Sequence, residues 1–314
     1  MQGRSNNFGF IVTTARNDFL FAKGLIENIY QKYPTIPICL LVDGNFELDG
    51  VENRYNANVI RRKEVSNKFL REQSYGWGLT KMVAFWESPF DTFLLLDADT
   101  CIWGNIMSFL DFENFDIIID KPLKDYRKED IDEYFFETSL LLKFYPEFNP
   151  LGRPYFCTGV IPARKGIFDI DDYKQIMSLS IENPSLFKYG EMGMLNFLIQ
   201  QYVDREKIRI KLAETQVIVP DYDPSEIEKR FSPKHIQPSS RENVVLHWCG
   251  KAKPVVYNKY GFNTELMTHY RMGYLDRKNI DSKKAMKVMT SEDRWRDIRI
   301  QSKYYKKRAL SLFR

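Results

Sequence analysis

A run of apolar residues, Phe93-Leu94-Leu95-Leu96, is followed directly by Asp97 and, one residue later, by Asp99. Consecutive apolar residues of this kind are typical of a strand that is buried on both faces. A charge at the end of a buried strand is costly unless something pairs with it. Ligands of open α/β sheets also bind at the carboxyl ends of strands. The stretch therefore favours a divalent cation or a reacting group at the two aspartates.

Similar short apolar runs recur along the chain, and segments with helical spacing separate most of them. Strands are predicted at 8–14, 36–43, 56–62, 93–97, 115–120, 155–163 and 244–248. Helices are predicted at 17–33, 79–88 and around 191–201, with a charged and aromatic helical insertion between about 121 and 153. Alternating strands and helices predict an α/β fold with a parallel-rich sheet.

Composition narrows the class of protein. The 314 residues are 44% hydrophobic and 28% charged, which is ordinary for a globular chain. The four cysteines form no C-x-x-C pair, so neither a zinc ribbon nor a disulfide framework is indicated, and a reducing compartment is expected. No apolar run approaches the roughly 20 residues of a membrane span, and the first residues lack the order of a signal peptide. We expect a cytoplasmic protein, at most peripheral at the inner face of a membrane.

Charge divides the chain into two parts. Residues 251–314 hold 17 basic and 6 acidic residues, which leaves 29 basic and 36 acidic residues in 1–250. This charge difference indicates a mildly acidic body followed by a strongly basic tail, and the tail is expected to have a role of its own.

Three interpretations of Asp97 and Asp99 compete on the pattern alone. Both can be turn and cap residues, for which aspartate is common. The stretch can also contain the nucleophilic aspartate of a phosphatase related to the haloacid dehalogenases, although its fifth position is Cys101 and it lies far from the start of the chain. The third interpretation is an Asp-x-Asp clamp for Mg²⁺ or Mn²⁺, which take hard oxygen ligands and keep substrate phosphates in their shell.

Six segments decide among these interpretations through their order and spacing. They are IVTTARND (11–18), LTK with a tryptophan (79–86), DADT with the following Asn-Ile (97–106), FCTGV (156–160), GEMGMLN (190–196) and HWCGKAKP (247–254). In these segments the chain resembles glycogenin and its relatives, the retaining glycosyltransferases of family eight, which have the GT-A fold. The resemblance runs through most of residues 8–254.

The resemblance implies a set of site residues. It places the nucleotide-sugar against Thr14, Ala15, Arg16, Asn17, Lys81, Asp97, Ala98, Asp99, Cys157, Thr158, Gly159, Gly250 and Lys253. It makes Asp97, Asp99 and His247 the ligands of Mn²⁺ or Mg²⁺, and it gives Glu191 and Asp120 roles at the transferred sugar. The implied donor is a UDP-sugar.

The segment around His247 also has a physical meaning of its own. A histidine at the end of an apolar strand is more often a hydrogen-bonded core residue than a ligand. Here Gly250 lets the backbone approach a phosphate, and Lys253 supplies a compact positive charge, although Lys253 can also be a solvated lysine before a turn. Imidazole beside two carboxylates is a usable ligand set for Mn²⁺.

The chain departs from the family pattern at its sugar end. Leu20 replaces a tyrosine that stacks near uracil, and Cys157 replaces an asparagine. Glu191 and Met192 replace an aspartate-glutamine pair, and Glu191 can also be a helix N-terminal residue favoured by the helix dipole. Glucose or galactose on UDP is therefore only the default donor.

The basic tail predicts a helix. Apolar residues recur at three-and-four spacing, at Trp295, Ile298, Tyr305, Ala309 and Leu312. Leu310 and Phe313 widen this stripe, and basic residues surround it, namely Arg296, Arg299, Lys303, Lys306 and Lys307. The helix either packs on the body with a solvated basic face or lies on anionic lipid, making a peripheral membrane contact through residues 290–314.

The sequence thus predicts a GT-A catalytic domain at 1–255 and a basic, aromatic helical extension at 256–314. The expected activity is metal-dependent transfer of a hexose, with retention, from a UDP-sugar to a glycan or lipid-linked hydroxyl acceptor. Two alternatives remain open: a degenerate transferase acting as a UDP-sugar or carbohydrate-binding scaffold, and a sugar-phosphate nucleotidyltransferase. The latter would want a glycine-rich phosphate loop, which TTARND (13–18) lacks. No nucleic-acid partner is expected, because no recognised module accompanies the basic charge.

Overall fold

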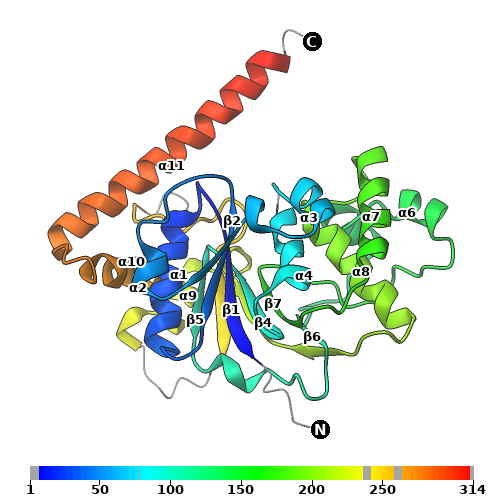
Figure 1. Ribbon diagram of the computed structural model, residues 1–314, viewed down its shortest axis with the longest axis horizontal. Coiled ribbons are helices and arrows are strands. Elements are labelled where there is room, and N and C mark those ends of the chain that lie inside the picture. Colours follow the sequence, from blue (N-terminus) through cyan, green and yellow to red (C-terminus); the bar gives the residue numbers. More distant parts are fainter. Residues whose placement is uncertain (1–6, 77, 236–241, 258–263, 312–314) are drawn as a thin grey trace.

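A seven-stranded mixed sheet forms the centre of the molecule in the computed structural model, which describes residues 7–76, 78–235, 242–257 and 264–311. The strand order is β3-β2-β1-β4-β7-β6-β8, and Figure 1 labels its central strands β2, β1, β4, β7 and β6. The strands are β1 (Phe8–Ala15), β2 (Ile38–Asp43), β3 (Asn58–Arg61), β4 (Thr92–Asp97), β6 (Ile117–Asp120), β7 (Val160–Arg164) and β8 (Ile210–Ala213). Neighbours from β3 to β4 are parallel, whereas β7 is antiparallel to both β4 and β6. The predicted α/β class is confirmed.

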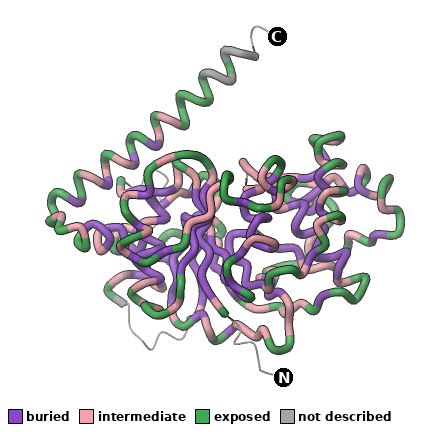
Figure 2. Tube along the Cα trace, in the orientation of Figure 1, coloured by how far each residue is buried: buried purple, intermediate pink, exposed green. Residues whose placement is uncertain are grey.

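Helices cover both faces of this sheet. They are α1 (Phe19–Lys32), α2 (Val51–Arg54), α3 (Lys68–Gln73), α4 (Ala84–Glu87), α5 (Lys128–Tyr134), α6 (Thr138–Phe144), α7 (Ile170–Glu182), α8 (Glu191–Asp204), α9 (Pro224–Arg230), α10 (Glu265–Asp276) and α11 (Ser282–Ser311). Successive residues of a strand point to opposite faces. Accordingly, Phe10 of β1 packs in the core that contains Leu25 of α1, whereas Ile11 packs in the core that contains Phe197 of α8. Figure 2 shows the buried residues gathered along the strands.

A second, three-stranded sheet lies beside the end of β4. It contains β5 (Thr100–Trp103), β10 (Val244–His247) and β9 (Gln216–Ile218), in that order. β10 is antiparallel to β5, with His247 opposite Thr100, and parallel to β9. Because only Ala98 and Asp99 separate β4 from β5, the chain passes from one sheet to the other at the Asp-x-Asp stretch. This passage brings the end of β10 close to the end of β4.

Most of the predicted elements are present, with changes at their ends. The predicted helix at 79–88 is a 3₁₀ turn at Leu79–Val83 followed by α4, and the predicted strand at 155–163 begins only at Val160. The insertion at 121–153 contains α5 and α6, as expected. None of the helices in the described ranges is long and apolar enough to cross a membrane.

The two C-terminal helices behave differently from each other. α10 packs on α1 and buries Leu266, Met267 and Tyr270. α11 continues away from the body, and its far end stands clear of the other elements (Figure 1).

The predicted apolar stripe of the tail faces solvent where it is described, with Trp295, Ile298 and Tyr305 exposed. Arg296, in contrast, is buried and does not belong to a solvated basic face. The side chains of Lys306, Lys307, Ala309, Leu310, Leu312 and Phe313 lie outside the described residues.

Candidate active site

A cavity of about 980 Å³ opens at the carboxyl ends of β1 and β4. From β1 the strands continue outward through β2 and β3 in one direction, and from β4 they continue in the other direction. Ligands of open α/β sheets usually bind at such a topological switch point. Thr14 and Ala15 line the cavity from β1, and Asp97 and Asp99 line it from the end of β4. The cavity lining also includes Glu191 and further residues of the predicted set, namely Lys81, Ala98, Cys157, Thr158, Gly159, His247, Gly250 and Lys253.

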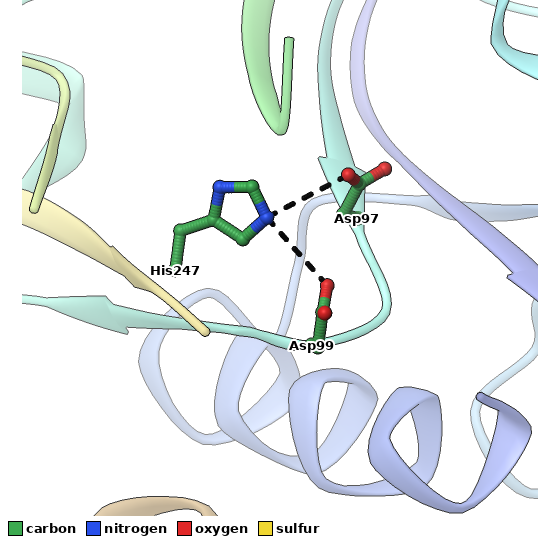
Figure 3. Close-up of side chains that lie close together, drawn as sticks. All are labelled: Asp97, Asp99 and His247. Atoms are coloured by element: carbon green, nitrogen blue, oxygen red, sulfur yellow. Dashed lines mark ion pairs between the residues drawn. The ribbon is translucent and has the colours of Figure 1, made fainter. Parts of the chain in front are cut away.

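Asp97, Asp99 and His247 converge on one point in this cavity (Figure 3). One ligand atom from each lies within 4.8 Å of the others. The Nε2 atom of His247 is 3.7 Å from Asp97 Oδ2 and 3.7 Å from Asp99 Oδ1. Two carboxylates and an imidazole suit Mn²⁺ or Mg²⁺, with room for phosphate oxygens on the open side. The three residues predicted as metal ligands therefore lie where one ion can contact all of them.

Backbone and hydroxyl contacts hold the two aspartates in place. The Thr13 hydroxyl donates to Asp97 Oδ1 at 3.1 Å, and the Thr100 hydroxyl donates to the Asp97 carbonyl at 2.8 Å. The amide of Trp248, next to His247, donates to the Asp99 carbonyl at 3.0 Å. Because these contacts come from β1, β5 and β10, the cluster is fixed at the junction of the two sheets.

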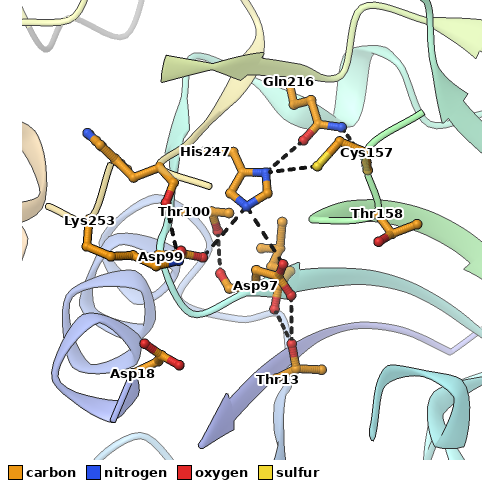
Figure 4. Close-up of polar contacts among 12 residues, drawn as sticks. Thr13, Asp18, Asp97, Asp99, Thr100, Cys157, Thr158, Gln216, His247 and Lys253 are labelled. Carbon is orange, nitrogen blue, oxygen red and sulfur yellow. Dashed lines mark hydrogen bonds and ion pairs between the residues drawn. The ribbon is translucent and has the colours of Figure 1, made fainter. Parts of the chain in front are cut away.

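Lys253 forms an ion pair with Asp99 (Figure 4). Burial raises the pKa of Asp99, but Lys253 and His247 lower it by more, so its net pKa is below the usual value. Burial lowers the pKa of Lys253, and Asp99 and Asp18 reverse this effect. Both side chains are therefore charged at neutral pH. Lys253 thus places a positive charge beside Asp99 at the edge of the cavity.

A second buried ion pair lies across the cavity. The Lys81 ammonium is 2.9 Å from Asp97 Oδ2 and 2.6 Å from Glu191 Oε1, and the Thr158 hydroxyl donates to Glu191 at 2.8 Å. Burial lowers the pKa of Lys81, but Asp97 and Glu191 raise it well above its ordinary value. Gly78 has φ +80°, and a Cβ atom there would lie 1.7 Å from Glu191 Oε2. The Glu191 carboxylate thus occupies the space that any side chain at position 78 would need.

His247 makes its other contacts with Gln216 and Cys157. Its Nδ1 atom is 3.1 Å from Gln216 Oε1 and 3.7 Å from Cys157 Sγ. A Cβ atom on Gly159 would lie 2.2 Å from the ring, so the glycine permits this close approach. Burial lowers the pKa of His247, but Cys157 and the two aspartates raise it to a net value above the usual one. A cation that binds Nε2 would displace a proton from this ring at low pH.

Asp120 lies outside the set of described residues that line the cavity. Its Oδ1 accepts hydrogen bonds from the Thr215 amide at 2.8 Å, the Thr215 hydroxyl at 3.0 Å and the Gln216 amide at 3.1 Å. Burial raises the pKa of Asp120 to about 6. These hydrogen bonds fix the start of β9 to Asp120. Because Asp120 is not among the cavity-lining residues, its position does not support the predicted role at the sugar.

Arg16 and Asn17 also lie outside the cavity lining, unlike their neighbours Thr14 and Ala15. Arg16 faces a groove between α1 and α11 that Leu20 and Trp295 also line. Asn17 Oδ1 accepts a hydrogen bond from Arg299 of α11 at 2.9 Å. In this arrangement α11 engages the residues that the family resemblance assigns to the nucleotide.

Several cavity residues were not predicted from the sequence. Asp18 lines the cavity and lies 3.6 Å from Arg296 of α11, and Tyr126 and Tyr189 line it from the far side. Thr13 donates a hydrogen bond to Asp97, and Gln216, outside the cavity lining, lies 3.1 Å from His247 Nδ1. Thr13 and Asp18 lie within the IVTTARND segment and could have been found from their position at the end of β1. No sequence signal marks Gln216.

Comparison with solved structures identifies the fold. The structure is similar to that of the galactosyltransferase LgtC in complex with donor and acceptor sugar analogues, with a TM-score of 0.54, 14% identity, and coverage of 83% of this chain and 94% of LgtC. It is also similar to the glycosyltransferase GlyE of Streptococcus pneumoniae TIGR4, with a TM-score of 0.50 and 13% identity, over 92% of this chain and 63% of GlyE.

No protein-family model matches the chain, and no curated protein sequence matches it. The sequence resemblance and the structural similarity nevertheless agree on the architecture. The chain has the fold of the GT-A glycosyltransferases, as the sequence predicted.

Proposed function

We propose that this protein is a metal-dependent glycosyltransferase that moves a hexose from a UDP-sugar to a hydroxyl acceptor with retention of configuration. The observation that carries the proposal is the convergence of Asp97, Asp99 and His247 at the carboxyl end of β4, inside the main cavity of a GT-A fold. The similar structures described above are of glycosyltransferases, and one of them holds donor and acceptor sugar analogues.

The residues of the metal end have distinct tasks in this proposal. Asp97, Asp99 and His247 would hold Mn²⁺ or Mg²⁺, which would supply Lewis-acid stabilisation to the leaving diphosphate. Lys253 adds a positive charge to the same region, where negative charge grows as the bond between sugar and diphosphate breaks. Gly250, with φ +61°, gives the backbone a close approach to the phosphates. In a complex with the donor, Lys253 would pair with a phosphate oxygen in place of Asp99.

The residues of the opposite side face the transferred sugar. Glu191 is held by Lys81 and Thr158 as a buried carboxylate, which can accept hydrogen bonds from sugar hydroxyls. Cys157, Thr158 and Gly159 approach from the loop before β7. Glucose or galactose is the default sugar. Retention proceeds through attack on the same face as the departing phosphate, and isolation of a covalent glycosyl-enzyme would count against that route.

The nucleotide is assigned to the end of β1. Thr14, Ala15 and Ala98 line this part of the cavity, and Arg16 and Asn17 follow directly along the chain. Asp120 is proposed to contribute to activity only indirectly, by holding the start of β9 in place.

The acceptor is assigned to the glycan or lipid-linked class, with a peripheral membrane contact through residues 290–314. The described part of that segment supports the proposal by exposing Trp295, Ile298, Tyr304 and Tyr305 beside Lys303. Aromatic and basic side chains together suit the boundary between an anionic bilayer and water. We divide the chain into a catalytic domain at 1–255 and an extension at 256–314. The first helix of this extension is α10, which packs on α1.

The test is release of UDP from a panel of UDP-sugars with Mn²⁺, repeated with EDTA and with the variant Asp99→Asn. Slow hydrolysis of one donor that both controls abolish would support the activity and identify the sugar. UDP binding in the presence of Mn²⁺ without turnover of any donor or acceptor would favour a carbohydrate-binding scaffold. Absence of UDP binding would overturn the proposal.

A further inference from the structure

His247 presents its two ring nitrogens to opposite surroundings. Nε2 faces the carboxylates of Asp97 and Asp99, 3.7 Å from each, and Nδ1 faces Gln216 and Cys157 (Figure 4). The ring is buried, with 3% of the residue exposed. In a neutral imidazole only one nitrogen carries a proton, and the other has the lone pair that can bind a metal. The hydrogen bond at Nδ1 therefore decides whether Nε2 is a ligand.

The amide of Gln216 is fixed in one orientation. Its Nε2 atom donates to the carbonyl of Cys157 at 2.7 Å, and a carbonyl oxygen can only accept. The other amide atom, Oε1, is consequently the one that lies 3.1 Å from His247 Nδ1. Because Oε1 can only accept, the proton must be on Nδ1. The lone pair of the neutral ring then points from Nε2 toward the two carboxylates.

The backbone around Gln216 is held as firmly as its side chain. Its amide donates to Asp120, its residue pairs with Val245 in the parallel ladder of β9 and β10, and only 8% of it is exposed. Two strands that lie side by side thus carry the metal ligand and its hydrogen-bond acceptor. This explains why a buried carboxylate at position 120, outside the cavity, can matter to the site.

We infer that Gln216 is a positioning residue that selects the tautomer of His247 in which Nε2 can bind a divalent cation. The inference rests on the proposed metal site and extends it to a residue that contacts neither metal nor substrate. Outer partners of ligating histidines generally fix the tautomer and ring orientation, and their loss weakens metal binding about 10–100-fold.

Cys157 provides the competing arrangement. Its Sγ atom is 3.7 Å from Nδ1, and its thiol can donate a weak hydrogen bond to an unprotonated Nδ1. The proton of the ring would then be on Nε2, where it would donate to Asp97 or Asp99 and exclude a cation. Removing the Gln216 acceptor removes the contact that opposes this arrangement most directly.

The first measurement is Mn²⁺ affinity by electron paramagnetic resonance of the full chain, comparing the unmodified protein with Gln216→Met. Methionine keeps the approximate volume and removes both amide hydrogen bonds. We expect the affinity to fall about 10–100-fold. The matched control is Gln200→Met, because Gln200 is also buried and its Nε2 donates to a backbone carbonyl, that of Pro154 at 3.1 Å. This control removes a comparable buried hydrogen bond and is expected to leave the Mn²⁺ affinity unchanged.

The second measurement reports the tautomer directly and needs no metal. The chain has three histidines, so ¹⁵N-histidine NMR gives few signals, and His247→Gln identifies the one of interest. In the metal-free protein, at a pH above the pKa of His247, we expect protonated Nδ1 and unprotonated Nε2. Gln216→Met should move the proton population toward Nε2, and Gln200→Met should not.

The outcomes separate this inference from the proposed function. Unchanged Mn²⁺ affinity and an unchanged tautomer in Gln216→Met would overturn the inference and leave the metal site intact. An equal loss of affinity in Gln200→Met would also overturn it, because the effect would then be general loosening of the fold. Failure of the unmodified protein to bind any divalent cation would overturn the proposed metal site itself.

Discussion

Two clusters of charged side chains in this molecule are built differently. Between α10 and α11, Arg271 is 2.9 Å from Asp293 and 3.1 Å from Glu292, and Asp293 is completely buried. At the end of β4, His247 stands 3.7 Å from both Asp97 and Asp99. The first cluster, here termed the closed cluster, has its charges in direct contact. The second, termed the open cluster, leaves an ion-sized gap between its ligand atoms.

The difference separates charge used for structure from charge kept for a ligand. In the closed cluster each acid is neutralised by a base that reaches it, so nothing further is required. In the open cluster, Thr13 contacts Asp97 Oδ1 and Lys253 contacts Asp99 Oδ2, whereas Asp97 Oδ2 and Asp99 Oδ1 face His247. Lys81 also contacts Asp97 Oδ2, from the side of Glu191. Substitutions in the closed cluster should therefore reduce stability, whereas those in the open cluster should reduce metal binding and turnover.

The largest effect is expected for Asp293→Ala, which leaves Arg271 buried without its closest partner. Removing one member of a buried ion pair costs about 3–5 kcal/mol in the free energy of unfolding. Urea denaturation measures this loss. Turnover below the new melting temperature should stay close to that of the unmodified protein. A loss below about 1 kcal/mol, the range of exposed ion pairs, would show that the closed cluster is not structural.

Asp99→Asn in the open cluster is expected to raise the activation free energy of turnover by a comparable amount. Loss of a metal ligand removes several kcal/mol of charge stabilisation at the leaving diphosphate, which corresponds to roughly 10³-fold in turnover. Initial rates of UDP release with saturating Mn²⁺ measure the effect. Removal of metal by EDTA should reproduce it in the unmodified protein. If Asp99→Asn instead lost stability and kept its activity, the two clusters would have exchanged roles.

Asp120→Asn tests the support behind the open cluster through pH. The pKa of Asp120 is about 6 in the folded protein and about 3.8 when exposed, so the folded state holds the proton more tightly. Unfolding free energy therefore falls as pH rises through this window, by up to about 3 kcal/mol. Asparagine keeps the acceptor oxygen and has no charge, so the variant should lack this fall. Parallel pH profiles of the two proteins in urea denaturation between pH 4 and pH 7 would contradict the prediction.

The smallest effect is expected for Thr13→Val. The substitution preserves the shape of the side chain and removes the hydrogen bond to Asp97, which is worth about 1–2 kcal/mol because the acceptor is charged. The loss should appear as weaker Mn²⁺ binding by isothermal titration calorimetry. Thr290→Val in α11 is the matched control, since its hydroxyl donates only to the Met286 carbonyl at 2.8 Å. Equal effects of the two substitutions would mean that Thr13 does not orient Asp97.

The sequence predicted the strands of the large sheet other than β8 (Ile210–Ala213), because they are local apolar runs. Asp97 follows an apolar strand and His247 ends another, which indicates a position at a sheet edge, and the family resemblance then grouped them with Asp99 as metal ligands. The short strands β5 and β9 were not predicted either, since Thr100–Trp103 and Gln216–Ile218 are too short to show periodicity. Gln216 was missed for the same reason, because its role depends on the pairing of β9 with β10.

Arg296 illustrates a second limit. A basic residue in a basic tail is expected to be solvated, yet Arg296 is buried over the ring of Phe21, 5.3 Å from its centre, and beside Asp18. Helical spacing predicted α11 correctly but could not show which of its faces meets α1. That choice is made by Ala285, Met289 and Asp293, which are buried on the same side.

Gly78 and Glu191 share one space, and this ties their evolution together. Any residue with a Cβ atom at position 78 would meet the Glu191 carboxylate and would also need to adopt φ +80°. A substitution at position 78 therefore requires the Glu191 carboxylate to move away from Lys81 and Thr158, whose contacts now hold it. The loop before the 3₁₀ turn at Leu79–Val83 and the start of α8 are thus expected to change together rather than independently.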